Sequence, residues 1–184
     1  MKTLVIHPKD KSTEFLKPIY ENIEDATILI GGLYNPNYIS ELIESHEQVI
    51  MLGHGTPSGL LSVGQFPNCG AYVIKDIHVE LLSKKSNNIY IWCYASDFVK
   101  EHNLKGFASG MFISEVEEAE DHLLTEQTQE QIDESNDYFS KLLGEVSLEP
   151  SNKVYEFVKE KYKLITNHNL TALYNYERLY LNFD

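Results

Sequence analysis

The sequence predicts a three-layer α/β fold built around a mainly parallel β-sheet. Short apolar runs alternate with amphipathic segments over residues 1–115, a pattern typical of strand–helix–strand units. Two runs, 49–52 and 88–92, are almost entirely apolar, as expected for strands buried on both faces of a sheet. The chain has 184 residues, which suits a single domain with a sizeable core.

The first elements follow from apolar runs and their polar boundaries. Residues 3–6 form an apolar run that predicts the first strand. Asp10 and Ser12 are suitable caps for a helix over 13–21, whose apolar residues recur at helical spacing. A second strand is expected at 26–30, where two glycines end it.

The middle of the chain predicts another helix, a hairpin and a further helix. The helix at 37–45 is expected to face inward through Tyr38, Leu42 and Ile43. Residues 60–63 and 71–74 flank a link rich in Gly, Pro and Asn, which favours a hairpin. A helix is then expected from Asp76 or Ile77 to about Lys85.

The later elements become more helical. A short helix is expected at 97–103 and a strand at 106–114, where small residues are frequent. Thr128 and Gln131 have the spacing of a capping box, which predicts a helix to about Leu143. Residues 151–163 predict another helix, and 172–183 fit either a helix or a late strand. We therefore expect one domain over 1–184, with a core at about 1–115 and a helical C-terminal extension at about 116–184.

Composition limits the function classes. The chain has 28 acidic and 15 basic residues and a formal net charge of −13. Such a surface repels phosphates, so neither nucleic acid nor a membrane is an expected partner, although basic peptides are compatible with it. The N-terminus reads as a strand and not as a signal peptide. The two cysteines do not suggest a disulfide framework, and a cytoplasmic location is expected.

Both of these apolar runs end abruptly on a reactive side chain. The first leads into Gly53-His54-Gly55, and the second leads into Trp92-Cys93-Tyr94. Parallel strands deliver their last residues to the carboxyl edge of the sheet, where open α/β folds keep their sites. If the two strands are neighbours, a base and a sulfur nucleophile share one cleft, as acyl transfer by a cysteine requires. The less specific interpretation is a turn histidine and a buried structural cysteine.

These motifs resemble those of the caspase-like cysteine peptidases, which include caspases, clostripain, gingipains, legumains, separase and CHAT proteins. The shared pattern is a strand ending in His-Gly, a hairpin and helix, and then a strand ending in Cys. The resemblance covers about residues 1–115, and Trp92 stands where a small residue is common in the family. It implies a caspase-like fold and a cysteine endopeptidase that cleaves a peptide or protein substrate without a cofactor. It also implies an oxyanion hole at the amides of Gly55 and Cys93.

The chemistry is consistent with these residue types. A thiol attacks only as a thiolate, so Cys93 needs a base, and His54 can take its proton and return one to the leaving amine. Backbone N–H groups can stabilise the oxyanion, and Gly55 has no side chain to block its own.

Other polar residues have weaker assignments. Glu115 and Glu117, with Glu118, could bind a basic P1 side chain of the substrate, while a solvated acidic surface is the simpler interpretation. His7 and Asp10 weakly resemble a deacetylase metal motif, but its paired acids are missing, so no metal site is expected.

Two alternative functions are also compatible with the sequence. The chain could be a non-catalytic caspase-like interaction module, or another thiol acyl-transfer hydrolase of the amidotransferase kind. The latter would favour glycines around its nucleophile, and Trp92-Cys93-Tyr94 contains none. The sequence does not determine the P1 preference, an activation step or the oligomeric state.

Overall fold

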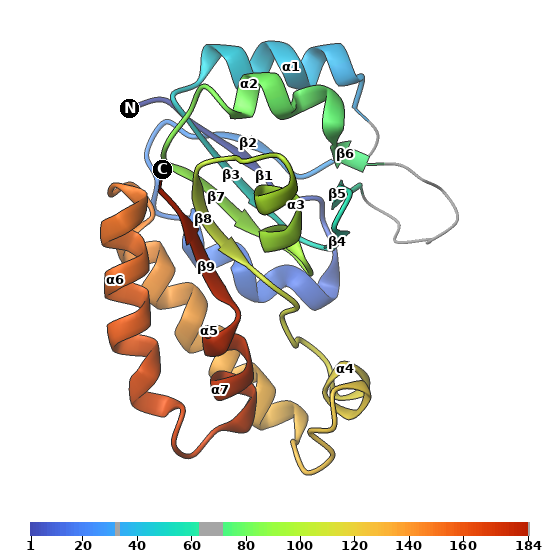
Figure 1. Ribbon diagram of the computed structural model, residues 1–184, viewed down its shortest axis with the longest axis vertical. Coiled ribbons are helices and arrows are strands. Elements are labelled where there is room, and N and C mark those ends of the chain that lie inside the picture. The colour runs from blue at the N-terminus through green and yellow to red at the C-terminus, as the bar shows by residue number, and fades with distance from the viewer. Residues whose placement is uncertain (32–33, 63–71, 184) are drawn as a thin grey trace.

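The computed structural model describes residues 1–31, 34–62 and 72–183. Its main element is a six-stranded sheet with the order β2-β1-β3-β7-β8-β9 (Figure 1). The strands are β1 (Thr3–Ile6), β2 (Thr27–Leu29), β3 (Gln48–Leu52), β7 (Asn88–Ile91), β8 (Gly106–Ser109) and β9 (Leu179–Asn182). All neighbouring pairs are parallel except β8 and β9, which are antiparallel. The predicted α/β class with a mostly parallel sheet is therefore confirmed.

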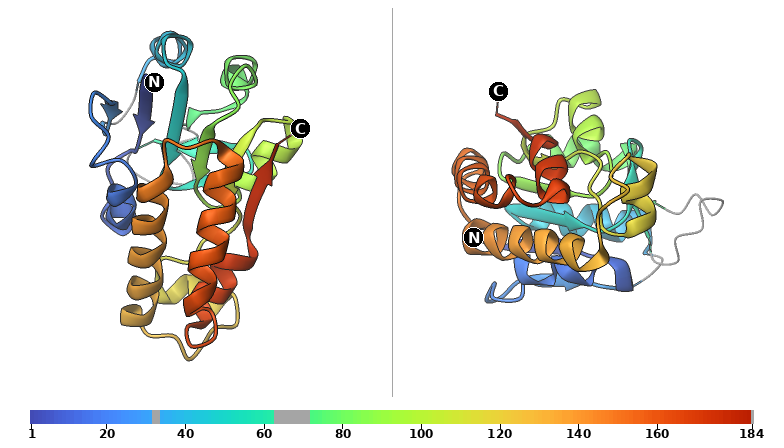
Figure 2. Two further views of the ribbon diagram at one scale, coloured as in Figure 1. Left: turned by 90° about the vertical axis from the view of Figure 1, so that its left-hand side faces the viewer. Right: turned by 90° about the horizontal axis from the view of Figure 1, so that it is seen from below.

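Helices cover both faces of this sheet. On one face they are α1 (Pro36–Ser45), α2 (Val79–Leu82) and α3 (Ala95–Glu101), and on the other η1 (Lys11–Ile19), α5 (Gln129–Val146) and α6 (Ser151–Tyr162). Figure 2 shows α5 and α6 side by side. The remaining helical elements are η2 (Asp76–His78), α4 (Val116–Asp121), η3 (Lys163–Ile165) and α7 (Leu170–Glu177).

The strand residues alternate between two apolar cores. In β3, Val49 and Met51 pack with the α1–α3 side, whereas Ile50 and Leu52 pack with the η1–α5–α6 side. This alternation follows from the two-residue period of a strand. Because both faces are covered, the run has no polar face, which explains why the sequence shows a continuous apolar stretch. Burying one such side chain contributes about 1.5–3 kcal/mol.

A second, three-stranded antiparallel sheet follows β3. It consists of β4 (Gly55–Thr56), β5 (Gly59–Leu61) and β6 (Tyr72–Ile74). The predicted hairpin pairing between the 60–63 and 71–74 segments is confirmed by the β5–β6 ladder. Most of the link between them, including Cys69, lies outside the described residues.

Three sequence predictions need correction. The first is Tyr38, which is 45% exposed, because the helix buries Ile39 and Ile43, one turn apart, against the sheet. The second is the strand at 106–114, which ends at Ser109. Beyond it, side-chain amides take the place of a strand partner: Ile113 N–H donates to Asn175 at 2.9 Å, and Asn136 donates to Ile113 O at 3.0 Å.

The third correction concerns the C-terminal extension, which is not only helical. Residues 172–183 contain both the end of α7 and strand β9, which joins the main sheet beside β8. The extension also covers one face of the sheet through α5 and α6. Among the described residues, no helix is long and apolar enough to cross a membrane.

Candidate active site

The two motifs lie at the same edge of the sheet. Strands β3 and β7 are adjacent and parallel, with Leu52 opposite Ile91. The pairing extends one step further, because Gly53 N–H donates to Ile91 O at 3.0 Å. His54 and Cys93 each follow the last residue of their strand by two positions. The predicted placement at the carboxyl ends of neighbouring parallel strands is therefore confirmed.

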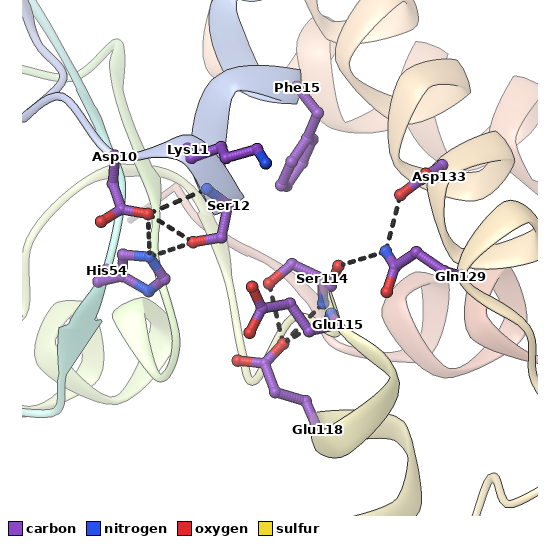
Figure 3. Close-up of a pocket in the computed structure, with 10 residues that line it drawn as sticks. All are labelled: Asp10, Lys11, Ser12, Phe15, His54, Ser114, Glu115, Glu118, Gln129 and Asp133. Carbon is purple, nitrogen blue, oxygen red and sulfur yellow. Dashed lines mark hydrogen bonds and ion pairs between the residues drawn. The ribbon is translucent and has the colours of Figure 1, made fainter.

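His54 is held by a third segment, the start of η1. Its Nε2 atom lies 2.8 Å from Ser12 Oγ and 3.5 Å from an Asp10 carboxylate oxygen. Figure 3 shows that the other ring nitrogen, Nδ1, points away from these two residues. Strand β1 lies next to β3, so the segment after β1 reaches the same edge as His54.

Asp10 and Ser12 have a local role as well. The Asp10 carboxylate accepts from the Ser12 amide at 2.9 Å and from the Ser12 hydroxyl at 2.7 Å, and it caps η1. Burial opposes ionisation, but these hydrogen bonds and the nearby His54 ring hold the pKa of Asp10 below its ordinary value. The sequence predicted the caps but not their contact with His54, because that contact depends on strand order.

Buried His7 anchors the same segment. Its ring nitrogens lie 3.1 Å from the Tyr20 hydroxyl and 3.2 Å from the Thr13 hydroxyl. Burial lowers the pKa of His7 to about 4, so the ring is neutral at pH 7. Among the described residues, no group of three or more His, Cys, Asp or Glu side chains could hold a metal ion.

The Cys93 sulfur is more deeply buried than the His54 ring. The residue is partly exposed, but its sulfur is sheltered and lies 3.8 Å from the carbonyl oxygen of Phe112. Burial raises the pKa of the Cys93 thiol to about 11, and the carboxylate of Glu118 adds to the increase. In this resting arrangement the thiol is protonated at neutral pH.

The turn after Cys93 is tight and strained. Tyr94 adopts a left-handed conformation with φ of 67° and begins α3. A non-glycine residue in this region costs about 1–3 kcal/mol, and such residues concentrate at functional sites. The structure therefore makes a sharp strand–turn–helix connection at Cys93 without glycine. The lack of glycine no longer argues against a thiol hydrolase of another kind.

Trp92 connects the two motifs. Its indole N–H donates to Thr56 O at 3.1 Å, and its ring packs on Gly55. A Cβ at Gly55 would overlap this ring, and Trp92 is only 1% exposed, so it has little room to move. Trp92 stands where the family commonly has a small residue, and its large ring fits here because Gly55 has no side chain.

The ladder geometry leaves the Gly55 amide directed away from β5. Leu61 N–H donates to His54 O at 2.9 Å, so these two residues form a hydrogen-bonded pair. Hydrogen-bonded and non-hydrogen-bonded pairs alternate along antiparallel strands, which makes Gly55 and Leu60 a non-hydrogen-bonded pair. The Gly55 N–H therefore faces the side opposite its strand partner, as a donor to a bound oxyanion must.

A cavity of about 720 Å³ lies beside His54. Figure 3 shows its lining, in which acidic side chains outnumber basic ones. Among the residues that the structure describes, the acidic lining residues are Asp10, Glu115, Glu118 and Asp133, and Lys11 is the one lysine of the lining. Of the predicted substrate-binding residues, Glu115 lines the cavity, whereas Glu117 is exposed and does not. Glu118, the third carboxylate of the predicted set, also lines the cavity and raises the pKa of the Cys93 thiol.

Buried amides from the C-terminal extension fix the far wall of the site. Asn136 of α5 and Asn175 of α7 hydrogen-bond to the backbone of Ile113, between Phe112 and the lining residue Ser114. The two amides also contact each other at 3.3 Å. Sequence reasoning missed them, because single asparagines within helices carry no spacing signal.

No protein-family model matches this chain, and no curated protein sequence matches it.

Proposed function

We propose that this chain is a cysteine endopeptidase of the caspase-like type, with Cys93 as nucleophile and His54 as general acid and base. The observation that carries the proposal is that both residues follow the carboxyl ends of adjacent parallel strands. The hairpin β4–β5 and helix α2 lie between them in the chain. This order matches the pattern of the family that the sequence resembles.

The proposed reaction forms a thioester. His54 takes the thiol proton, the sulfur attacks the scissile carbonyl, and a C–S bond forms as the carbonyl oxygen becomes an oxyanion. The amides of Gly55 and Cys93 donate to that oxyanion. His54 then gives its proton to the leaving amine as the C–N bond breaks, and water hydrolyses the thioester with His54 as the base.

The lining of the cavity supports a basic residue at P1 of the substrate. Glu115 and Glu118 line a partly enclosed space beside His54, where a carboxylate pairs well with Arg or Lys. The net charge of −13 would also steer basic segments toward the chain. A bound cation near Glu118 would offset the charge that disfavours the Cys93 thiolate.

One observation favours a second candidate, the non-catalytic interaction module. The Cys93 thiol is sheltered, its pKa is raised, and it contacts a carbonyl oxygen in the resting structure. Activity requires the thiol to leave Phe112 O, and a chain that never makes this change is a binding module.

The deciding experiment uses peptidyl acyloxymethyl ketones with Arg, Lys, Asp or Leu at P1. The peptidase proposal expects covalent labelling of Cys93, identified by peptide mass mapping, with Arg and Lys preferred. Cys93→Ala and His54→Ala should abolish labelling, whereas Cys69→Ala and the exposed-site control His168→Ala should retain it.

The outcomes separate the candidates. Preference for Asp or Leu contradicts the basic pocket but leaves the peptidase. Absence of labelling and of peptide cleavage by the folded protein supports the interaction module. Hydrolysis of a small amide such as glutamine, without peptide cleavage, supports the other thiol hydrolase.

A further inference from the structure

The hydrogen bonds around Asp10, Ser12 and His54 determine where the protons lie. One Asp10 oxygen, Oδ1, is 2.7 Å from Ser12 Oγ and 3.5 Å from His54 Nε2, while Ser12 Oγ is 2.8 Å from Nε2. The pKa of Asp10 lies below its ordinary value, so the carboxylate is ionised at neutral pH and can only accept.

A count of the donors leaves one arrangement. A serine hydroxyl has a single proton, and the short contact with a carboxylate oxygen requires that proton, because two bare oxygens at 2.7 Å would repel. Ser12 Oγ then has only lone pairs to offer His54. The 2.8 Å contact is a hydrogen bond only if Nε2 carries a proton and donates it. The neutral imidazole has one N–H, so Nδ1 keeps its lone pair.

We propose that Asp10 and Ser12 are positioning residues that hold His54 in the tautomer with the proton on Nε2 and a free lone pair on Nδ1. The inference concerns the resting protein and stands apart from the peptidase assignment. Its catalytic consequence rests on the proposed function: Nδ1 is the nitrogen that takes the Cys93 proton.

The same network excludes Ser12 as the nucleophile of a serine hydrolase. Such a nucleophile gives its proton to the histidine, and its histidine is oriented by a carboxylate on the opposite nitrogen. Here Asp10 approaches the hydroxyl and the same nitrogen, Nε2. The Ser12 proton is therefore directed to Asp10 and away from His54.

The network also prepares His54 for the charged state. When Nδ1 takes a proton, the ring becomes an imidazolium, and the Asp10 carboxylate lies 3.5 Å from its other nitrogen. The side chains of His54 and Asp10 are 23% and 29% exposed, so water screens this attraction only in part. The ring stays fixed in the same orientation before and after proton transfer.

The test is the tautomer of His54 in the full-length protein, measured by NMR of the 15N-labelled imidazole rings. A His54→Gln variant assigns the signal. We expect the Nε2–H form to dominate in the unchanged protein. In Ser12→Ala, the ratio of Nε2–H to Nδ1–H should fall by about tenfold or more, since a hydrogen bond to this donor is lost. Ser58→Ala, an exposed serine near the same motif, is the matched control.

Ser12→Ala retains the backbone amide that Asp10 accepts from, so the cap of η1 survives. Two further variants test the role of Asp10. Asp10→Ala frees the Ser12 proton to donate to Nε2, which should favour the Nδ1–H form. Asp10→Asn keeps an acceptor and should largely retain the original tautomer. Thermal unfolding followed by circular dichroism verifies that each variant is folded.

The inference is overturned if the unchanged protein has mainly Nδ1–H, or if Ser12→Ala leaves the tautomer ratio unchanged. If peptidase activity is present, Ser12→Ala should lower kcat and leave KM nearly constant, because the base and not the substrate site is altered. If no activity exists, the NMR result still decides the tautomer, so the two proposals fail separately.

Discussion

The two halves of the candidate site are prepared to different degrees. His54 lies in a polar network of ionised and neutral partners, whereas the Cys93 sulfur is sheltered and its thiol pKa is raised to about 11. In the resting protein the proposed base is already oriented, whereas the proposed nucleophile is still a protonated thiol. Under the proposed function, a substrate that brings positive charge near Glu118 would therefore change the Cys93 half most.

The strongest way to disturb both halves at once is Gly55→Ala. The new methyl group would overlap the Trp92 ring, which joins the two motifs and is buried. We expect a loss of about 3 kcal/mol in the free energy of unfolding, measured by urea denaturation, because overpacking at a rigid neighbour is costly. Gly31→Ala is the control, since its methyl would meet the terminal hydroxyl of Tyr34, which can move. Equal, small losses of unfolding free energy in both variants would contradict the tight packing of Trp92 on Gly55.

The His54 half can be tested through His7, which anchors the Asp10–Ser12 segment. Its pKa is lowered from 6.5 to about 4 by burial, so the unfolded chain binds the proton more readily. Keeping His7 neutral in the fold therefore costs nothing above pH 6.5. As the pH falls toward 4, this requirement lowers the free energy of unfolding by about 3 kcal/mol in total.

His7→Gln should therefore flatten the fall of unfolding free energy between pH 6.5 and pH 4, measured by urea denaturation at several pH values. The control is His168→Gln, an exposed histidine. A pH dependence in His7→Gln that matches the unchanged protein would show that His7 is not buried as the neutral ring.

The Cys93 half predicts slow reaction with a simple alkylating agent. A pKa of about 11 instead of 9.0 lowers the thiolate fraction at neutral pH about 100-fold. The greater nucleophilicity of a basic thiolate recovers roughly tenfold of this. In a Cys69→Ala background, iodoacetamide should thus label native Cys93 about tenfold more slowly than the urea-unfolded chain, with a rate that rises toward pH 11.

Peptidyl ketones that bind in the cavity should overcome the low thiolate fraction and label Cys93 faster than iodoacetamide does. Native and unfolded chains that react with iodoacetamide at the same rate would show that Cys93 has an ordinary environment. The proposed difference between an oriented His54 and a suppressed Cys93 thiolate would then be wrong.

The fold was accessible from sequence wherever one local pattern decided it. The runs at 49–52 and 88–92 are almost entirely apolar, which favours buried strands, and the Thr128–Gln131 capping box is complete within one turn. The end of β8 was not accessible, because it depends on amides of Asn136 and Asn175 that arrive from the C-terminal helices. β9 was ambiguous, because its partner β8 lies about 70 residues earlier in the chain.

The candidate site divides in the same way. His54 and Cys93 are each marked by the strand that they follow, so their placement could be predicted. The sequence predicts Asp10 and Ser12 as helix caps, and Asp10 does cap η1 through the Ser12 amide. Their contact with His54 could not be predicted, because it requires β1 to lie beside β3. The raised thiol pKa could not be predicted either, since it depends on burial of the sulfur in the folded chain and on the nearby charge of Glu118.

The smallest expected effect concerns the carboxylate that influences Cys93 from α4. Glu118 raises the pKa of the Cys93 thiol by its charge, in addition to burial. Glu118→Gln removes the charge but keeps an oxygen that can accept from the Ser114 amide and hydroxyl, so the local structure should persist. The thiol pKa should fall, and iodoacetamide labelling at neutral pH should accelerate about threefold. Glu117→Gln, an exposed neighbour in the same helix, should leave the rate unchanged and serves as the matched control. The Arg-P1 ketone should give the opposite result: it should label Glu118→Gln more slowly than the unchanged protein, because its cation loses a carboxylate partner in the cavity. If both reagents react faster, Glu118 disfavours the thiolate without binding substrate, and the basic P1 preference must come from Glu115 or be abandoned.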